Sequence, residues 1–165
     1  MRSLGTAQQG LWFGYLLNED RAMFNTAECI AFAGKIHAAT MIASVQQAVR
    51  ECEALSGVFV ADEDVRDWAM RDIRIAIDLQ RELPCRFVLL QAEGRDFLYS
   101  CVHHIALDGY GTNLLYQRIA ELYGAAMSGD SVPASEFGRY EDVLKEDAER
   151  DAQGRTAAAR GYWLE

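Results

Sequence analysis

The 165-residue sequence has no run of lysines or arginines, and its formal net charge is −9. A nucleic-acid-binding surface needs a basic patch, so nucleic acid is not expected as a partner. No segment approaches the ~20 apolar residues of a membrane-spanning helix, so no membrane partner is expected either. Near the N-terminus Gln8 and Gln9 interrupt the apolar residues, which makes this segment a poor signal peptide.

No pair of cysteines forms a C-x-x-C motif, which disfavours a structural zinc site or a redox dithiol. Each of the four cysteines lies among apolar residues, and we expect all four to be small core residues: Cys29, Cys52, Cys85 and Cys101. Reduced thiols are typical of a cytosolic protein, so the expected localisation is cytoplasmic.

Half of the residues are hydrophobic, which indicates a globular domain with a core of its own. Turn residues and alternating patterns predict strands over 26–36, 56–61, 85–91 and 96–104. Helical spacing predicts helices after Thr6, from Met41 to Leu55, and over 62–73, 112–127, 138–152 and 155–164. The "AEGR" segment predicts a hairpin between the last two strands. This order predicts an α/β fold with a mixed sheet flanked by helices, which we expect on one side of the sheet.

Two of the three histidines are adjacent in "CVHHIALDGYG", residues 101–111. Side chains alternate along a strand, so His103 and His104 should point to opposite faces. We expect His103 to pack inward and His104 to face an open cleft at the strand end, where an imidazole suits general base catalysis. The alternative is a satisfied core histidine. A metal site is not expected, because adjacent histidines on a strand diverge.

Asp108 and Gly109 follow the histidines at the mouth of the next predicted helix. The carboxylate of Asp108 has three possible roles, which are to orient an imidazole, to pair with an arginine or to cap the helix. Gly109 and Gly111 permit backbone geometry that other residues resist. The residues alone leave these alternatives open.

The stretch "HHIALDG" matches H-H-x-x-x-D-G at every fixed position. In this it resembles the condensation domains of nonribosomal peptide synthetases, and more widely acyltransferases with the chloramphenicol acetyltransferase fold. Four other stretches resemble motifs of this family in the same order: "SLGTAQQGLWF", "ECEALSGVF", "EFGRYEDVL" and "GYWLE". The H-H pattern argues against the heterocyclising branch, which carries D-x-x-x-x-D.

The resemblance implies an amide-forming acyltransferase in which His104 is catalytic and His103, Asp108 and Gly109 shape the loop. Donor and acceptor would arrive on the phosphopantetheine arms of carrier proteins, with no directly bound cofactor and no metal. Asp108 would form a salt bridge with an arginine. Because Ser56 stands where the second motif usually has that arginine, a substitute would come from Arg50, Arg74 or Arg139.

The resemblance also implies that residues 1–165 are the N-terminal lobe of a two-lobe domain whose C-terminal lobe is absent. Such a lobe should be inactive alone and should self-associate through its exposed apolar wall. The methionine beside the first motif favours a starter domain or the first domain of a siderophore synthetase. The alternatives are a small self-standing oligomeric acyltransferase of this fold and a noncatalytic interaction module.

Overall fold

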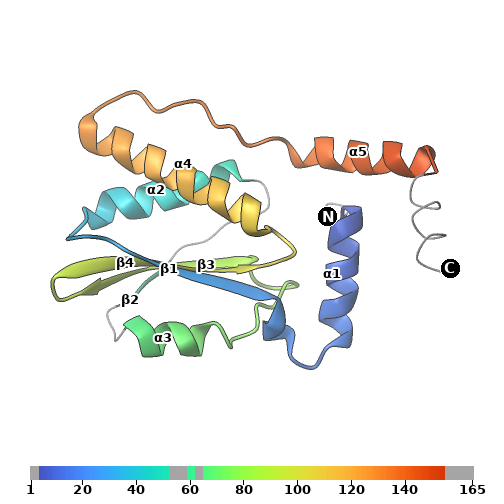
Figure 1. Cartoon of the computed structure of the whole chain (residues 1–165), viewed down its shortest axis with the longest axis horizontal. Helices are drawn as coiled ribbons and strands as arrows, with labels where there is room; N and C mark the ends of the chain where they lie inside the picture. Colours follow the sequence, from blue (N-terminus) through green and yellow to red (C-terminus); the bar gives the residue numbers. More distant parts are fainter. Residues whose placement is uncertain (1–3, 53–58, 62–64, 155–165) are drawn as a thin grey trace.

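The computed structural model describes residues 4–52, 59–61 and 65–154 (Figure 1). Within these ranges five α-helices, one short 3-10 helix and four strands form the fold. The helices are α1 (Thr6–Leu17), η1 (Arg21–Phe24), α2 (Ala38–Glu51), α3 (Val65–Asp72), α4 (Gly109–Ser128) and α5 (Tyr140–Ala152). The strands are β1 (Asn25–Ala31), β2 (Phe59–Ala61), β3 (Cys85–Ala92) and β4 (Arg95–His103).

The strands form one sheet in the order β1-β4-β3-β2. β4 is antiparallel to both β1 and β3, whereas β2 runs parallel to β3. The β3–β4 hairpin turns at Gly94, whose φ of 84° lies in the left-handed region that glycine adopts without strain. The predicted hairpin and the predicted mixed sheet are both confirmed.

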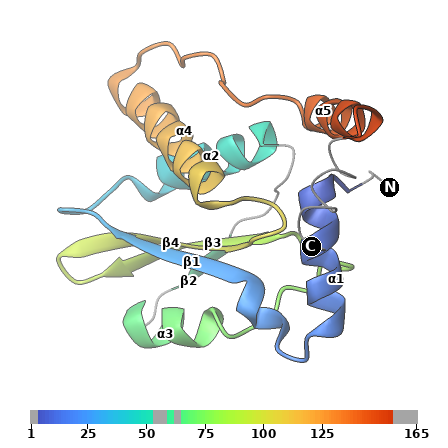
Figure 2. The same cartoon turned by 45° about the vertical axis from the view of Figure 1, so that its right-hand side comes forward.

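Helices cover both faces of this sheet, with α2 and α4 on one face and α3 on the other (Figures 1 and 2). Leu98 of β4 packs with α2 and α4 in one core cluster, and Tyr99 packs with Ile77 and Trp68 in another. The expectation of helices on one side was therefore wrong. β3 and β4 carry apolar side chains at successive positions, so both faces of these strands need a cover.

α1 stands across the end of the sheet, and α5 lies beside its first turn (Figures 1 and 2). The helix begins at Thr6, directly after its N-cap Gly5, which is one residue earlier than the sequence predicts. α5 supplies two of the capping groups, because the Gly5 N–H donates to the Tyr140 hydroxyl (3.0 Å) and the Thr6 N–H donates to Asp147 Oδ2 (2.7 Å). A carboxylate at this position also complements the helix dipole.

Several element boundaries and one cysteine differ from the sequence predictions. β1 ends at Ala31 rather than near 36, α2 ends at Glu51, and α4 begins three residues earlier than expected. Cys29 is exposed on β1, an edge strand, while the other three cysteines are buried. The predicted helix over 155–164, Leu55, Ser56 and the starts of the predicted elements at 56 and 62 lie outside the described residues. None of the described helices combines the length and apolar character needed to cross a membrane.

Candidate active site

His103 is the last residue of β4, and its side chain is completely buried. The imidazole packs edge-on against the Tyr15 ring of α1, with centroids 5.5 Å apart, and stacks on Phe24 at 5.7 Å. Its backbone N–H donates to the Pro84 carbonyl at 2.8 Å. Two aromatic rings and a backbone bond therefore fix this histidine inside the fold.

The protonation state of His103 follows from its contacts. Nδ1 accepts a hydrogen bond from the Ile105 N–H at 3.1 Å, which places the ring proton on Nε2. That buried Nε2 has no hydrogen-bond partner among the described residues. Burial, and to a lesser degree the nearby charge of His104, lowers the pKa of His103 to about 4. The ring is therefore neutral near pH 7, and a neutral ring accepts the Ile105 bond.

His104 follows directly after β4, and its side chain is exposed. Its backbone N–H donates to the Phe24 carbonyl at 2.8 Å. The turn that follows is closed by the Ala106 N–H, which donates to the His103 carbonyl at 2.9 Å. The main chain is thus held on both sides of an imidazole that reaches solvent. His103 is buried and His104 is exposed, which agrees with the expected alternation of side chains.

Asp108 is the N-cap of α4, where its Oδ1 accepts the Gly111 N–H at 2.8 Å. Its side chain is exposed, and no ion pair joins it to an arginine in the part of the chain that the structure describes. Of the three roles left open by the sequence, helix capping is the one this geometry shows. Gly109 and Gly111 both lie in the first turn of α4, and neither has a positive φ.

Gln8 of α1 contacts the histidine loop and was not among the predicted site residues. Its Nε2 donates to the Ile105 carbonyl at 2.9 Å. The "AQQG" stretch contains this glutamine, but helical spacing does not show that α1 lies against a loop nearly 100 residues away. Within the described ranges, no group of three His, Cys, Asp or Glu residues could hold a metal ion.

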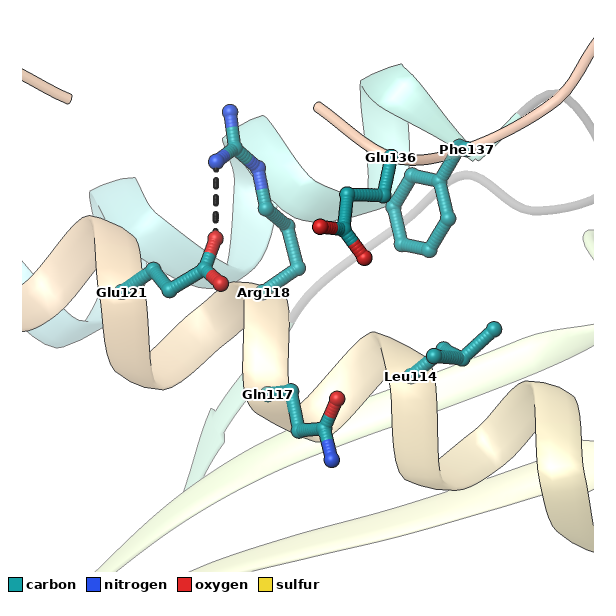
Figure 3. Close-up of a pocket in the computed structure, with 6 residues that line it drawn as sticks. All are labelled: Leu114, Gln117, Arg118, Glu121, Glu136 and Phe137. Carbon is teal, nitrogen blue, oxygen red and sulfur yellow. Dashed lines mark hydrogen bonds and ion pairs between the residues drawn. The ribbon is translucent and has the colours of Figure 1, made fainter. Parts of the chain in front are cut away.

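A small hollow between α4 and the segment before α5 is lined by Leu114, Gln117, Arg118, Glu121, Glu136 and Phe137 (Figure 3). Its volume of about 20 Å³ has room for one water molecule and not for a substrate. Arg118, almost fully buried, donates to Glu51 at 2.6 Å, to Glu121 at 3.0 Å and to the Pro133 carbonyl at 2.9 Å. These contacts join two helices and a loop, so the hollow is structural.

Comparison with known proteins supports the same architecture. Residues 60–165 match the condensation domain family. The isonitrile lipopeptide synthase of Streptomyces coeruleorubidus is 31% identical over 99% of this chain, which spans 13% of that protein. Enterobactin synthase component F of Escherichia coli O157:H7 is 26% identical over 98% of this chain and 15% of its own length.

Among solved structures, a variant of the starter condensation domain of rhizomide synthetase RzmA in complex with C8-CoA and Leu-SNAC has a TM-score of 0.87. The two are 25% identical, and the match covers 98% of this chain and 44% of that one. The 165 residues thus span less than half of each of these relatives. The family match extends over more than half of the chain, and the fold agrees with it: the chain belongs to the condensation domain family.

Proposed function

We propose that residues 1–165 form the N-terminal lobe of a condensation domain in a nonribosomal peptide synthetase. The complete domain joins the acyl or aminoacyl group of one carrier-bound thioester to the amine of a carrier-bound aminoacyl thioester. The observation that carries the proposal is the pairing of an exposed His104 with a buried, neutral His103 at the end of β4. A second lobe would close the site over His104.

The proposed reaction requires the protein to orient the amine and the thioester and to transfer one proton. The amine nitrogen attacks the thioester carbonyl carbon, the N–C bond forms and the C–S bond breaks. His104 takes the proton that the amine loses and returns it to the departing thiolate sulfur. A thioester is already activated, so no covalent nucleophile is required, and holding the two reactants in line supplies much of the rate.

The donor is proposed to be an acyl thioester of the starter type. The rhizomide starter domain, whose structure holds C8-CoA and Leu-SNAC, supports this assignment through its matching fold. The similarity to enterobactin synthase component F favours a siderophore synthetase as the setting. Phosphopantetheine belongs to the carriers in this proposal, and the lobe itself binds no cofactor.

The partners follow from this assignment: a donor carrier, an acceptor carrier and the C-terminal lobe. Without that second lobe, residues 1–165 are inactive and self-associate. Phe13 and Leu17 on α1 expose apolar side chains, and exposed apolar surface favours association with another protein surface.

The proposal is tested by mixing loaded donor and acceptor carriers with the complete domain and weighing the products by mass spectrometry. His104→Ala should lower the rate of amide formation by roughly 10²–10⁴-fold, the range of general acid–base catalysis. The matched control is His37→Ser, because His37 is also exposed, lies at the start of α2, and is replaced by a residue that can still cap that helix. Wild-type turnover in His104→Ala would remove His104 from the mechanism.

A further inference from the structure

The side chain of Gln8 joins three parts of the fold through both ends of its amide. Nε2 donates to the Ile105 carbonyl at 2.9 Å, one residue past His104. Oε1 accepts the Gly5 N–H at 3.1 Å and also the Tyr140 hydroxyl of α5. Gln8 is only half-buried, yet both ends of its amide are engaged. This one amide therefore connects the start of α1 and the start of α5 to the loop that carries His104.

The bond to Ile105 completes the restraint of the turn after β4. The Ile105 N–H is already held by Nδ1 of the buried His103 at 3.1 Å. With its carbonyl bound by Gln8, the peptide groups on both sides of Ile105 are fixed. One of these is the peptide bond between His104 and Ile105, so rotation of the main chain next to the His104 side chain is restricted from two directions.

We propose that Gln8 is a positioning residue, which holds the Ile105 carbonyl and thereby aims the His104 imidazole at the reacting amine. The inference rests on the proposed function, because it assigns a role in that reaction. A displacement of about 1 Å at a catalytic group can lower a rate by as much as ~10²-fold. Loss of this hydrogen bond should therefore lower kcat while leaving substrate binding nearly unchanged.

Gln8→Glu separates positioning from helix capping. A carboxylate at this site still accepts the Gly5 N–H and the Tyr140 hydroxyl, and it suits the N-terminus of α1. It has no donor for Ile105, and it repels that carbonyl. The matched control is Gln9→Glu, on the same turn and with the same charge change. Gln9 is exposed, and its Nε2 bonds to the Leu4 carbonyl at 3.1 Å, away from the loop.

In the complete domain, Gln8→Glu should lower kcat about 10- to 100-fold with KM within about twofold of wild type. Hydrogen exchange over residues 103–107 should become faster, and the melting temperature should stay within a few degrees. Gln9→Glu should match wild type in all three measurements. Wild-type kcat in Gln8→Glu overturns the proposal, as does an equal loss in Gln9→Glu or unchanged exchange over 103–107.

Should Gln8→Glu fail to fold, Gln8→Met decides by the same criteria, since it keeps the side-chain length without a charge and leaves Gly5 bonded to Tyr140. The exchange measurement also separates the two proposals. If the wild-type domain forms no amide, the proposed function fails, while faster exchange over 103–107 in the variant still supports the restraint by Gln8.

Discussion

The buried His103 should make the fold sensitive to mild acid. Its pKa is about 4 in the folded chain against an ordinary value of 6.5, because burial disfavours the charged ring. Between these values the unfolded chain binds a proton that the folded chain does not. The contribution of the neutral His103 ring to the free energy of unfolding is therefore complete above pH 6.5 and is lost as the pH falls toward 4.

The size of the effect follows from the shift. At 1.36 kcal/mol for each pKa unit, the difference between 6.5 and about 4 corresponds to about 3 kcal/mol. That is a large fraction of the ~5–15 kcal/mol by which domains are usually stable. Acid should thus weaken the fold well before most carboxylates are protonated.

The assay is urea unfolding at several pH values between 7 and 4, for wild type and for His103→Phe. Phenylalanine keeps an aromatic ring between Tyr15 and Phe24 and has no charge to gain. Its free energy of unfolding should fall less with acid than that of wild type, by about 3 kcal/mol over this range. Hydrogen bonds lower the pKa values of Glu51 and Asp96, so protonation of these carboxylates in acid also destabilises the fold. This loss should be equal in wild type and His103→Phe.

If the free energy of unfolding fell with pH by the same amount in wild type and in His103→Phe, the reasoning would be refuted. That result would mean that the ring is protonated in the folded chain without cost.

Two further predictions concern stability and are checked by urea unfolding at pH 7. Arg118→Ala should lower the free energy of unfolding by about 3–5 kcal/mol, because Glu51 loses its buried partner. Lys145 forms an exposed pair with Asp142, so Lys145→Ala should change the free energy of unfolding by less than ~0.5 kcal/mol. Equal losses of stability in the two variants would contradict this prediction. Asp108→Ala should cost about 1 kcal/mol and Asp108→Asn much less, since asparagine still caps α4. An asparagine variant as unstable as alanine would instead indicate a charged partner.

Local patterns in the sequence predicted the parts of this fold that depend on neighbouring residues. Gly94 and the apolar runs beside it determine the β3–β4 hairpin, and alternation at the end of β4 predicts a buried His103 and an exposed His104. These features need only the backbone geometry of one strand and one turn. The same alternation predicts that His103 faces inward, and its side chain is buried.

Contacts between distant segments could not be predicted in the same way. Periodicity identifies α1 but not the surface on which it packs, so neither the bond from Gln8 to Ile105 nor the capping of α1 by α5 was foreseen. Cys29 was expected in the core because its neighbours are apolar, yet β1 is an edge strand and leaves it exposed. The order of strands in a sheet determines which strands are exposed edges, and no short stretch of sequence determines that order.

β1 leaves the ribosome well before its partner strand exists. Ala31 pairs with Phe97 and Asn25 with His103. Roughly 70 further residues must therefore be added first, which takes about 4–14 s at ~5–20 residues per second. Until then the N–H and C=O groups of β1 that will pair with β4 are open to other nascent chains on the same message. Codon-dependent translation speed between residues 31 and 97 therefore determines how long the emerging chain is exposed to misassociation.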